Sequence, residues 1–359
     1  MSKLKAGVIG SGAIAESKHI PSAISTGLVD FVGFCDVDEK RAERVCKELG
    51  TKHAKHYTDY RKLLDDNSID VVYVCTPNRT HCEVSVAALK SGKHVMCEKP
   101  MAINSLEAEK MVKAAKETGK LLTIGYQCRF NPEYQYIKKF ADDGGFGDMY
   151  FARAKALRRR AVPTWGVFIN EQEQGGGPLI DIGTHALDLT LWTMNNYKPK
   201  YAVGTVYHKL NDQTDTGNAW GDWNPKEFTV EDSAFGFIVM ENGATIILES
   251  SWALNDRFPM EAIFTLSGTK AGVDFIDGVH INHVQGGYQS VTEVCTSGKG
   301  VKFYDADAVD KPEVLEQKVF LNAVLGNGKL TVTPEQAFVV TQILDGIYES
   351  AKTGKPVYF

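Results

Sequence analysis

The chain of 359 residues lacks the marks of several large protein classes. No apolar run approaches the roughly 18 residues of a membrane span, and the N-terminus lacks the apolar segment and cleavage site of a signal peptide. Basic charge is not in excess, because 40 Lys and Arg stand against 45 Asp and Glu, a formal charge of −5. A surface for nucleic acid phosphates is therefore not expected. These absences predict a cytoplasmic globular protein that binds neither a membrane nor nucleic acid.

Cysteine and histidine also lack the spacings of disulfide or metal sites. The seven cysteines are odd in number and include no C-x-x-C pair, which favours small buried thiols in a reducing compartment. His280 and His283 lie in a strand-like run, where their side chains would point to opposite faces. His185 has two carboxylates nearby but no second histidine at ligand spacing. We expect no metal site and no catalytic cysteine.

The order of predicted elements divides the chain near Asp148. Before it, short apolar strands alternate with helices, as in a doubly wound parallel sheet. After it come long alternating runs, one of them 228–240, with a hairpin signal at 241–243 and one helix over 179–194. The predicted fold is α/β: a Rossmann domain in 1–148 and an α+β domain with a large, mostly antiparallel sheet in 149–359. The C-terminal helix, which begins near Thr333, could return to the first domain.

Capping residues mark several helix starts in the first domain. Asp38 and Asn104 are placed to cap helices over 39–49 and 105–118. Thr80 and Glu83 have the spacing of a capping box, which predicts that another helix opens there.

A glycine-rich turn after the first predicted strand is the strongest local motif. Residues 10–15, GSGAIA, match G-x-G-x-x-G/A between a strand and a helix. Gly10 permits the tight turn, Gly12 lets the backbone approach a pyrophosphate, and Ala15 lets helix and strand pack closely. The helix N-terminus offers amides and a positive dipole end to phosphates. The alternative is a glycine-rich turn with no ligand.

Asp36 ends the second predicted strand, where an acid can bond the adenosine ribose of a dinucleotide. A carboxylate there repels a 2′-phosphate, and the next residue is Val37 rather than an arginine. NAD is therefore favoured over NADP. Arg41 could rescue NADP binding, but we expect it on the solvated face of its helix.

Polar residues also follow the next two parallel strands, at the sheet edge where ligands bind. His81 near a helix start is either exposed or part of the site. Lys99, at the end of a buried strand and before Pro100, either snorkels to solvent or stands beside a nicotinamide.

Asp181, His185 and Asp188 share one face of the helix predicted over 179–194. One interpretation is a buried histidine satisfied by the carboxylates of its own helix. The other is a group that exchanges protons with a substrate.

The motifs at 10–15, 75–81, 98–100 and 175–188, in this order and spacing, resemble those of the Gfo/Idh/MocA oxidoreductases, which include the myo-inositol dehydrogenases. The resemblance spans essentially the whole chain. It implies NAD as cofactor, a second domain that often forms dimers or tetramers, and a cis bond before Pro100. It implies a catalytic group of Lys99, Asp181 and His185. The expected cofactor contacts are Gly10, Ser11, Gly12, Ala13, Ile14, Ala15, Asp36, Thr76, Pro77, Asn78, His81, Glu98, Lys99, Gln127 and Trp165.

A mechanism follows from that group. Hydride loss from a secondary alcohol needs a base for the hydroxyl proton, and His185 is the first choice, with Asp181 orienting it or holding a neighbouring hydroxyl. Lys99 would stabilise the developing alkoxide. The reverse assignment, with Lys99 as base, stays open.

The expected substrate contacts are Lys99, Arg158, Trp165, Asp181 and His185. A solvated basic turn with a packed aromatic is the alternative for Arg158 and Trp165. Trp220 and Trp223 lie in a long polar segment and could stack on a sugar or anchor a subunit contact.

The segment from Arg158 to Trp165 resembles that of family members that oxidise the C3 hydroxyl of pyranosides. We therefore predict a sugar, glycoside or cyclitol dehydrogenase that converts a hexopyranoside to a 3-keto product. The chain is expected to form a homo-oligomer through its C-terminal sheet. The alternatives are an NAD-dependent glycoside hydrolase that works by transient C3 oxidation and elimination, and a non-catalytic NAD-sensing regulator.

Overall fold

The computed structural model describes residues 3–213, 215–295 and 310–359. The chain forms two compact units. Unit 1 comprises Met1–Gln127 and Val309–Phe338, and unit 2 comprises Cys128–Ala308 and Val339–Phe359. No helix in the described ranges is both long enough and apolar enough to cross a membrane.

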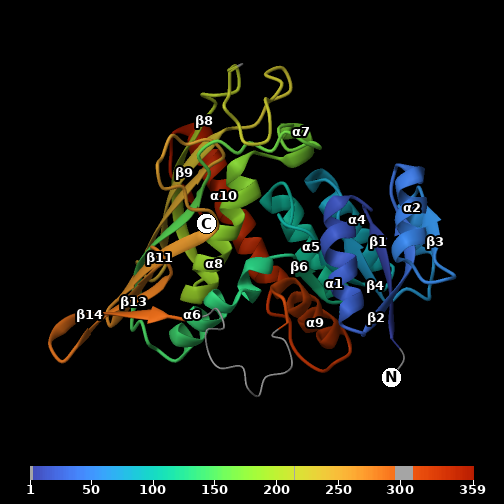
Figure 1. The fold of residues 1–359 in the computed structure, drawn as a ribbon, viewed down its shortest axis with the longest axis horizontal. Helices are drawn as coiled ribbons and strands as arrows, with labels where there is room; N and C mark the ends of the chain where they lie inside the picture. The colour runs from blue at the N-terminus through green and yellow to red at the C-terminus, as the bar shows by residue number, and fades with distance from the viewer. Residues whose placement is uncertain (1–2, 214, 296–309) are drawn as a thin grey trace. The chain divides into compact units, whose positions relative to one another are not determined.

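Unit 1 contains a six-stranded parallel sheet in the order β3-β2-β1-β4-β5-β6 (Figure 1). All four residues of β4 are buried, as expected for a strand covered on both faces. The predicted doubly wound parallel sheet is confirmed. The strands are β1 Leu4–Ile9, β2 Val29–Cys35, β3 Lys55–Tyr57, β4 Val71–Val74, β5 His94–Cys97 and β6 Leu122–Ile124. The helices are η1 Ala15–His19, α1 Ile20–Ser25, α2 Glu39–Leu49, α3 Tyr60–Leu64, α4 Asn78–Lys90, α5 Ser105–Thr118 and α9 Pro312–Val324.

Two of the three predicted helix starts in unit 1 are confirmed. Asp38 caps α2 and Asn104 caps α5, each by accepting a backbone N–H of the first turn. The capping box at Thr80 is wrong, because α4 already begins at Asn78. Thr80 instead donates its hydroxyl hydrogen to the carbonyl of Pro77, and Glu83 accepts a hydrogen bond from Tyr60.

A segment far along the chain completes the core of unit 1. Helix α9 packs against α1 (Figure 1), and its Phe320 and Leu321 join the cluster that contains Val8 and Tyr73. The ring of Phe320 meets that of Tyr73 edge-on, with centroids 6.2 Å apart. The C-terminal helix predicted from Thr333 is α10, Pro334–Thr353, and from Val339 onward it belongs to unit 2.

Unit 2 contains a nine-stranded sheet in the order β14-β13-β12-β11-β7-β10-β9-β8-β15. Among the described residues, neighbouring strands of this sheet are antiparallel except β7 and β10, so the predicted mostly antiparallel sheet is confirmed. The strands are β7 Met149–Leu157, β8 Pro199–Tyr207, β9 Ser233–Met240, β10 Thr245–Ser251, β11 Ile263–Gly268, β12 Ala271–Asp274, β13 Val279–Gln285, β14 Tyr288–Val294 and β15 Val357–Tyr358. The helices besides α10 are α6 Pro132–Asp142, α7 Glu171–Gln174, η3 Leu179–Gly183 and α8 Thr184–Met194.

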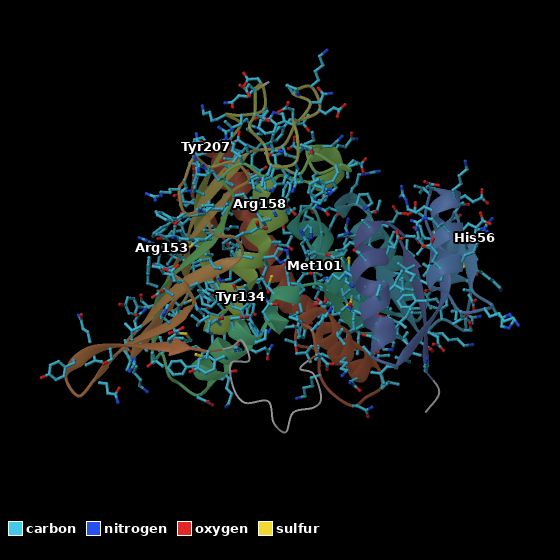
Figure 2. All side chains as sticks on the ribbon, in the orientation of Figure 1. His56, Met101, Tyr134, Arg153, Arg158 and Tyr207 are labelled. Carbon is cyan, nitrogen blue, oxygen red and sulfur yellow. The ribbon has the colours of Figure 1, made fainter. Side chains whose placement is uncertain are left out.

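Helices cover one face of the unit 2 sheet. Helix α8 packs against β7 and β11, and α10 brings Ile347 against Gly204 and Gly236. Along β7, alanines 152, 154 and 156 are buried while Arg153 is exposed. Figure 2 shows Arg153 projecting from the opposite side of the sheet. That side carries exposed apolar side chains, among them Val203 and Phe237.

The predicted boundary at Asp148 marks the change of sheet, since β6 ends the first and β7 begins the second. The division into compact units falls earlier, within η2, Gln127–Phe130, because α6 packs against α8 of unit 2. The strand predicted over 228–240 begins only at Ser233. Phe228 is buried against Trp252 from a loop, which accounts for the apolar start of that run.

Candidate active site

The glycine turn of unit 1 has the geometry expected of a phosphate site. Gly10 has φ +89°, and a Cβ there would lie 2.5 Å from the carbonyl oxygen of Cys75 at the end of β4. A Cβ on Gly12 would meet nothing within 4 Å, so the backbone faces open space. The Glu16 amide bonds the Gly12 carbonyl 3.0 Å away, so the amides of Ala13 and Ile14 belong to a first helical turn that no preceding carbonyl satisfies.

Asp36 is buried beside this turn. Its carboxylate accepts the Ser11 amide at 3.0 Å and the Asp38 amide at 2.9 Å. Arg41 does not simply lie on the solvated face of α2 as expected. Its guanidinium stays half-exposed but lies 3.3 Å from Asp36. The carboxylate keeps further lone pairs for a hydroxyl donor.

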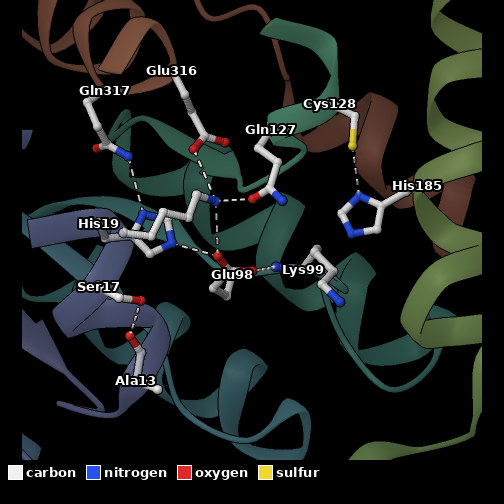
Figure 3. A network of polar contacts seen from close by, with 11 residues as sticks. Ala13, Ser17, His19, Glu98, Lys99, Gln127, Cys128, His185, Glu316 and Gln317 are labelled. Atoms are coloured by element: carbon white, nitrogen blue, oxygen red, sulfur yellow. Dashed lines mark hydrogen bonds and ion pairs between the residues drawn. The ribbon is translucent and has the colours of Figure 1, made fainter. Parts of the chain in front are cut away.

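Behind the ends of the strands lies a buried network of charged side chains (Figure 3). Glu98 accepts from His19 Nε2 at 2.6 Å and lies 3.5 Å from Lys18 Nζ. Lys18 also bonds the side-chain oxygen of Gln127 and lies 3.4 Å from Glu316 of α9. Lys18 and His19 come from the π-helical turn η1, which follows the phosphate-type turn directly.

Charge in this network is distributed unequally. Burial opposes the charge of Glu98, but Lys18 and His19 outweigh it and hold the pKa of Glu98 well below its ordinary value. Burial raises the pKa of Glu316, against the effect of Lys18. Burial opposes the charge of Lys18 too, yet the two carboxylates raise its pKa. Burial and neighbouring charge therefore shift the pKa values of the two carboxyls in opposite directions.

The Glu98–Lys99–Pro100 segment is fixed by this network and by His81. The Lys99 amide donates to Glu98 Oε2 at 3.0 Å, and the Lys99–Pro100 bond is cis, as the resemblance implies. His81 is buried, and its ring nitrogens lie 2.8 Å from the Pro100 carbonyl and 2.9 Å from that of Thr76. Burial lowers the pKa of His81 against these two contacts. His81 thus joins two loops instead of lying exposed.

Unit 2 positions the helix of Asp181 and His185 from distant strands. The Glu231 carboxylate, just before β9, accepts the Gly177 amide at 2.7 Å and the Leu179 amide at 3.1 Å, which satisfies the start of η3. A Cβ on Gly177 would lie 2.2 Å from the Glu231 carbonyl, so only glycine permits this approach.

The three polar residues of this helix have different partners. Trp252, just after β10, donates its indole N–H to Asp181 at 3.0 Å. His185 Nδ1 lies 3.8 Å from the sulfur of Cys128 (Figure 3). Asp188 pairs with Arg129 at 2.6 and 2.9 Å, so it serves this buried ion pair.

Arg158 and Trp165 lie in loops that follow β7. Arg158 holds Glu261 through two bonds of 2.6 and 2.5 Å, and it also interacts electrostatically with Asp181. Its guanidinium lies 5.2 Å above the ring of Trp220. Trp165 and Trp220 are both about half exposed, whereas Trp223 is buried against Phe228.

Several of these groups lie outside the residues chosen from the sequence. Lys18 and His19 belong to no sequence motif used above. The available signal was that two adjacent basic residues end the helical turn after the glycine motif. Trp252 and Glu231 reach their partners only through the pairing of distant strands. Within the described ranges, no three His, Cys, Asp or Glu side chains gather as metal ligands would.

The fold and its turn define an α/β protein with a dinucleotide-type binding domain. Residues 4–126 match the family model of the oxidoreductase family with an NAD-binding Rossmann fold, and residues 134–274 match the GFO/IDH/MocA C-terminal domain. The chain belongs to the Gfo/Idh/MocA oxidoreductase family, as its motifs implied.

Relatives match the chain over nearly its full length or over about half of it. The chain is 34% identical to D-glucoside 3-dehydrogenase of Escherichia coli K12, over 99% of this chain and 97% of that one. It is 28% identical to inositol 2-dehydrogenase of Salmonella typhimurium over 54% of this chain and 56% of that protein. A crystal structure of levoglucosan dehydrogenase with NADH and levoglucosan shares the fold, with a TM-score of 0.84 at 22% identity over 99% of both chains.

Proposed function

We propose that this protein is an NAD-dependent dehydrogenase that oxidises a secondary hydroxyl of a sugar, glycoside or cyclitol. The finer proposal is oxidation at C3 of a hexopyranoside to a 3-keto product. The observation that carries it is the 34% identity to D-glucoside 3-dehydrogenase, which spans nearly all of both chains.

The residues of unit 1 fit a dinucleotide. Open space above Gly12 and the first-turn amides suit a pyrophosphate. The hydroxyl oxygen of Thr76, at the end of β4, is buried with no hydrogen-bond partner among the described residues, and a bound cofactor could satisfy it. The proposed cofactor contacts remain Gly10 to Ala15, Asp36, Thr76 to Asn78, His81, Glu98, Lys99, Gln127 and Trp165. Of these, His81, Glu98 and Gln127 would act through the loops and side chains that they hold.

NAD is proposed over NADP because Asp36 would repel a 2′-phosphate. Because Arg41 lies beside Asp36 and could attract a 2′-phosphate, the preference for NAD over NADP can be tested by removing Asp36. Asp36→Ala should raise the ratio of kcat/KM with NADP to that with NAD by about tenfold, because it removes the repulsion and leaves Arg41 with only its longer 3.7 Å pair to Asp38. Asp38→Ala, a loss of a cap on the same helix, is the control. An unchanged ratio in Asp36→Ala would remove the basis for the NAD assignment.

The chain's own residues would supply the acid–base chemistry. NAD, when bound, accepts the hydride from the alcohol carbon. His185 would take the hydroxyl proton, with Asp181 orienting it or holding a neighbouring hydroxyl. The Lys99 ammonium would stabilise the alkoxide, and the opposite division, with Lys99 as base, is kept as the alternative. Trp252 keeps Asp181 in place by its N–H donation.

Purified protein with NAD and a panel of hexoses, glycosides and inositols tests the proposal. NADH should accumulate with a hexopyranoside, and the product should carry a ketone at C3. Aglycone release without net NADH would favour the hydrolase instead. NAD binding without turnover of any polyol would favour the regulator.

Quaternary structure and location complete the proposal. The open face of the unit 2 sheet exposes Val203, Tyr207 and Phe237, which supports a homo-oligomer through this face. Phe237→Asp should shift the mass measured by light scattering to that of a smaller species. A cytoplasmic location rests on the sequence alone and stays a prediction.

A further inference from the structure

Two tryptophans from different loops of unit 2 pack against each other at the surface. Trp165 is 52% exposed and Trp220 is 44% exposed. Their ring centroids are 4.9 Å apart at 77°, and Phe168 meets Trp165 edge-on at 5.9 Å. We call Trp165, Phe168 and Trp220 the aromatic platform. Its rings are ordered by one another but leave a broad apolar surface in water.

The platform is held by bonds between its two loops. Thr164 donates to the Trp220 carbonyl at 2.7 Å, and the Ala219 amide donates to the Arg160 carbonyl at 2.9 Å. The Asn218 side chain bonds both the amide and the carbonyl of Val162, at 2.8 and 3.0 Å. These hydrogen bonds join the two loops to each other, so the exposed rings have a defined position.

Arg158 and its loop support the platform and connect it with Asp181. Its guanidinium lies 5.2 Å from the centre of the Trp220 ring. Glu261 and the Ala161 carbonyl accept three of its five N–H groups, which ties these loops together. The loop that carries Trp165 also meets the proposed catalytic group: the Ala161 amide donates to the Trp252 carbonyl at 2.9 Å, and the Trp252 indole donates to Asp181 at 3.0 Å.

We propose that the aromatic platform is the subsite for the aglycone of the substrate, a second ring linked to the oxidised pyranose. This inference rests on the proposed function and narrows its substrates from sugars in general to glycosides with a ring-shaped aglycone. An indole face stacks on an aryl ring or on the C–H face of a second sugar, and it gains little from a methyl group or a free hydroxyl. Buried Trp223, 4% exposed, shows how a purely structural tryptophan in the same segment is placed.

The test compares kcat/KM for phenyl and methyl D-glucopyranosides, both anomers, at saturating NAD. In Trp220→Ala the phenyl-to-methyl ratio should fall about tenfold, the size of a lost stacking contact of about 1.4 kcal/mol. Trp220→Phe should keep most of the ratio. Tyr136→Ala is the matched control, because Tyr136 is a similarly exposed aromatic of unit 2 on α6. A ratio that is unchanged in Trp220→Ala, or that falls equally in Tyr136→Ala, overturns the subsite.

A binding experiment separates this proposal from the proposed function. If the wild-type protein oxidises no glucoside, the proposed function has failed, and calorimetry with phenyl β-D-glucopyranoside still tests the platform. Saturable binding that weakens about tenfold in Trp220→Ala, and less in Trp220→Phe, supports it. Absence of saturable binding, or equal affinity in all variants, overturns it.

Discussion

The groups around Lys99 in unit 1 are held by charge, whereas those around Asp181 in unit 2 are held by an indole N–H and packed rings. Glu98 accepts from His19 and faces Lys18, and its other oxygen takes the Lys99 amide. Asp181 accepts from Trp252, whose ring lies 6.4 Å from that of Phe228. The first arrangement should respond to pH and to neutral isosteres, because burial and neighbouring charge shift the pKa values of its carboxyls. The second should respond to side-chain shape.

Lys99→Met tests whether the lysine held beside the charged network takes part in the reaction. Turnover should fall by about a thousandfold, within the range for loss of a positioned proton-transfer or electrostatic group. NAD affinity, measured by calorimetry, should stay within about tenfold. Lys40→Met, on the exposed side of α2, is the control. Turnover equal to that of the wild type would remove Lys99 from the chemistry.

Neutral isosteres of two carboxyls give the next largest effect. Glu98→Gln leaves Lys18 without its main anion and should lower the free energy of unfolding by about 3 kcal/mol at neutral pH. Burial opposes the charge of Glu316, so Glu316→Gln, which keeps the shape and removes that charge, should cost less than Glu98→Gln. Urea unfolding of both variants measures the contrast.

The pH dependence of the same variants has a definite sign. The lowered pKa of Glu98 gives the wild type stability that is present above its ordinary value of 4.5 and is lost as pH falls below it. The raised pKa of Glu316 has the opposite effect, since the folded state holds that proton more tightly and loses stability as pH rises above 4.5. Glu316→Gln should therefore gain on the wild type as pH rises. Equal stabilities of the two variants at every pH would contradict the unequal charges of the network.

The two regions also differ in how far the sequence predicts them. In unit 1 the turn at Gly10, the acid Asp36 and the Lys99 segment follow the parallel strands β1, β2 and β5, so the β–α alternation alone collects them at one sheet edge. The contribution of α9 to unit 1 was not predictable, because Glu316 is nearly 300 residues from Lys18 in the chain. In unit 2 the helix over 179–194 was predictable from its pattern. Its partners Glu231 and Trp252 were not, since strand register places them.

The smallest expected effect concerns the hydrogen bond from Trp252 to Asp181 in unit 2. Trp252→Phe keeps most of the ring but removes the N–H that Asp181 accepts, a hydrogen bond to a charged group worth about 1.5–3 kcal/mol. Turnover should fall about tenfold with little change in KM, because Asp181 loses orientation and the substrate contacts remain. Trp223→Phe is the matched control: its indole nitrogen is buried without a hydrogen-bond partner among the described residues. That variant should keep full turnover and equal or exceed the wild type in stability, because it deletes an unsatisfied donor. If both variants lost turnover alike, packing of the rings alone would place Asp181.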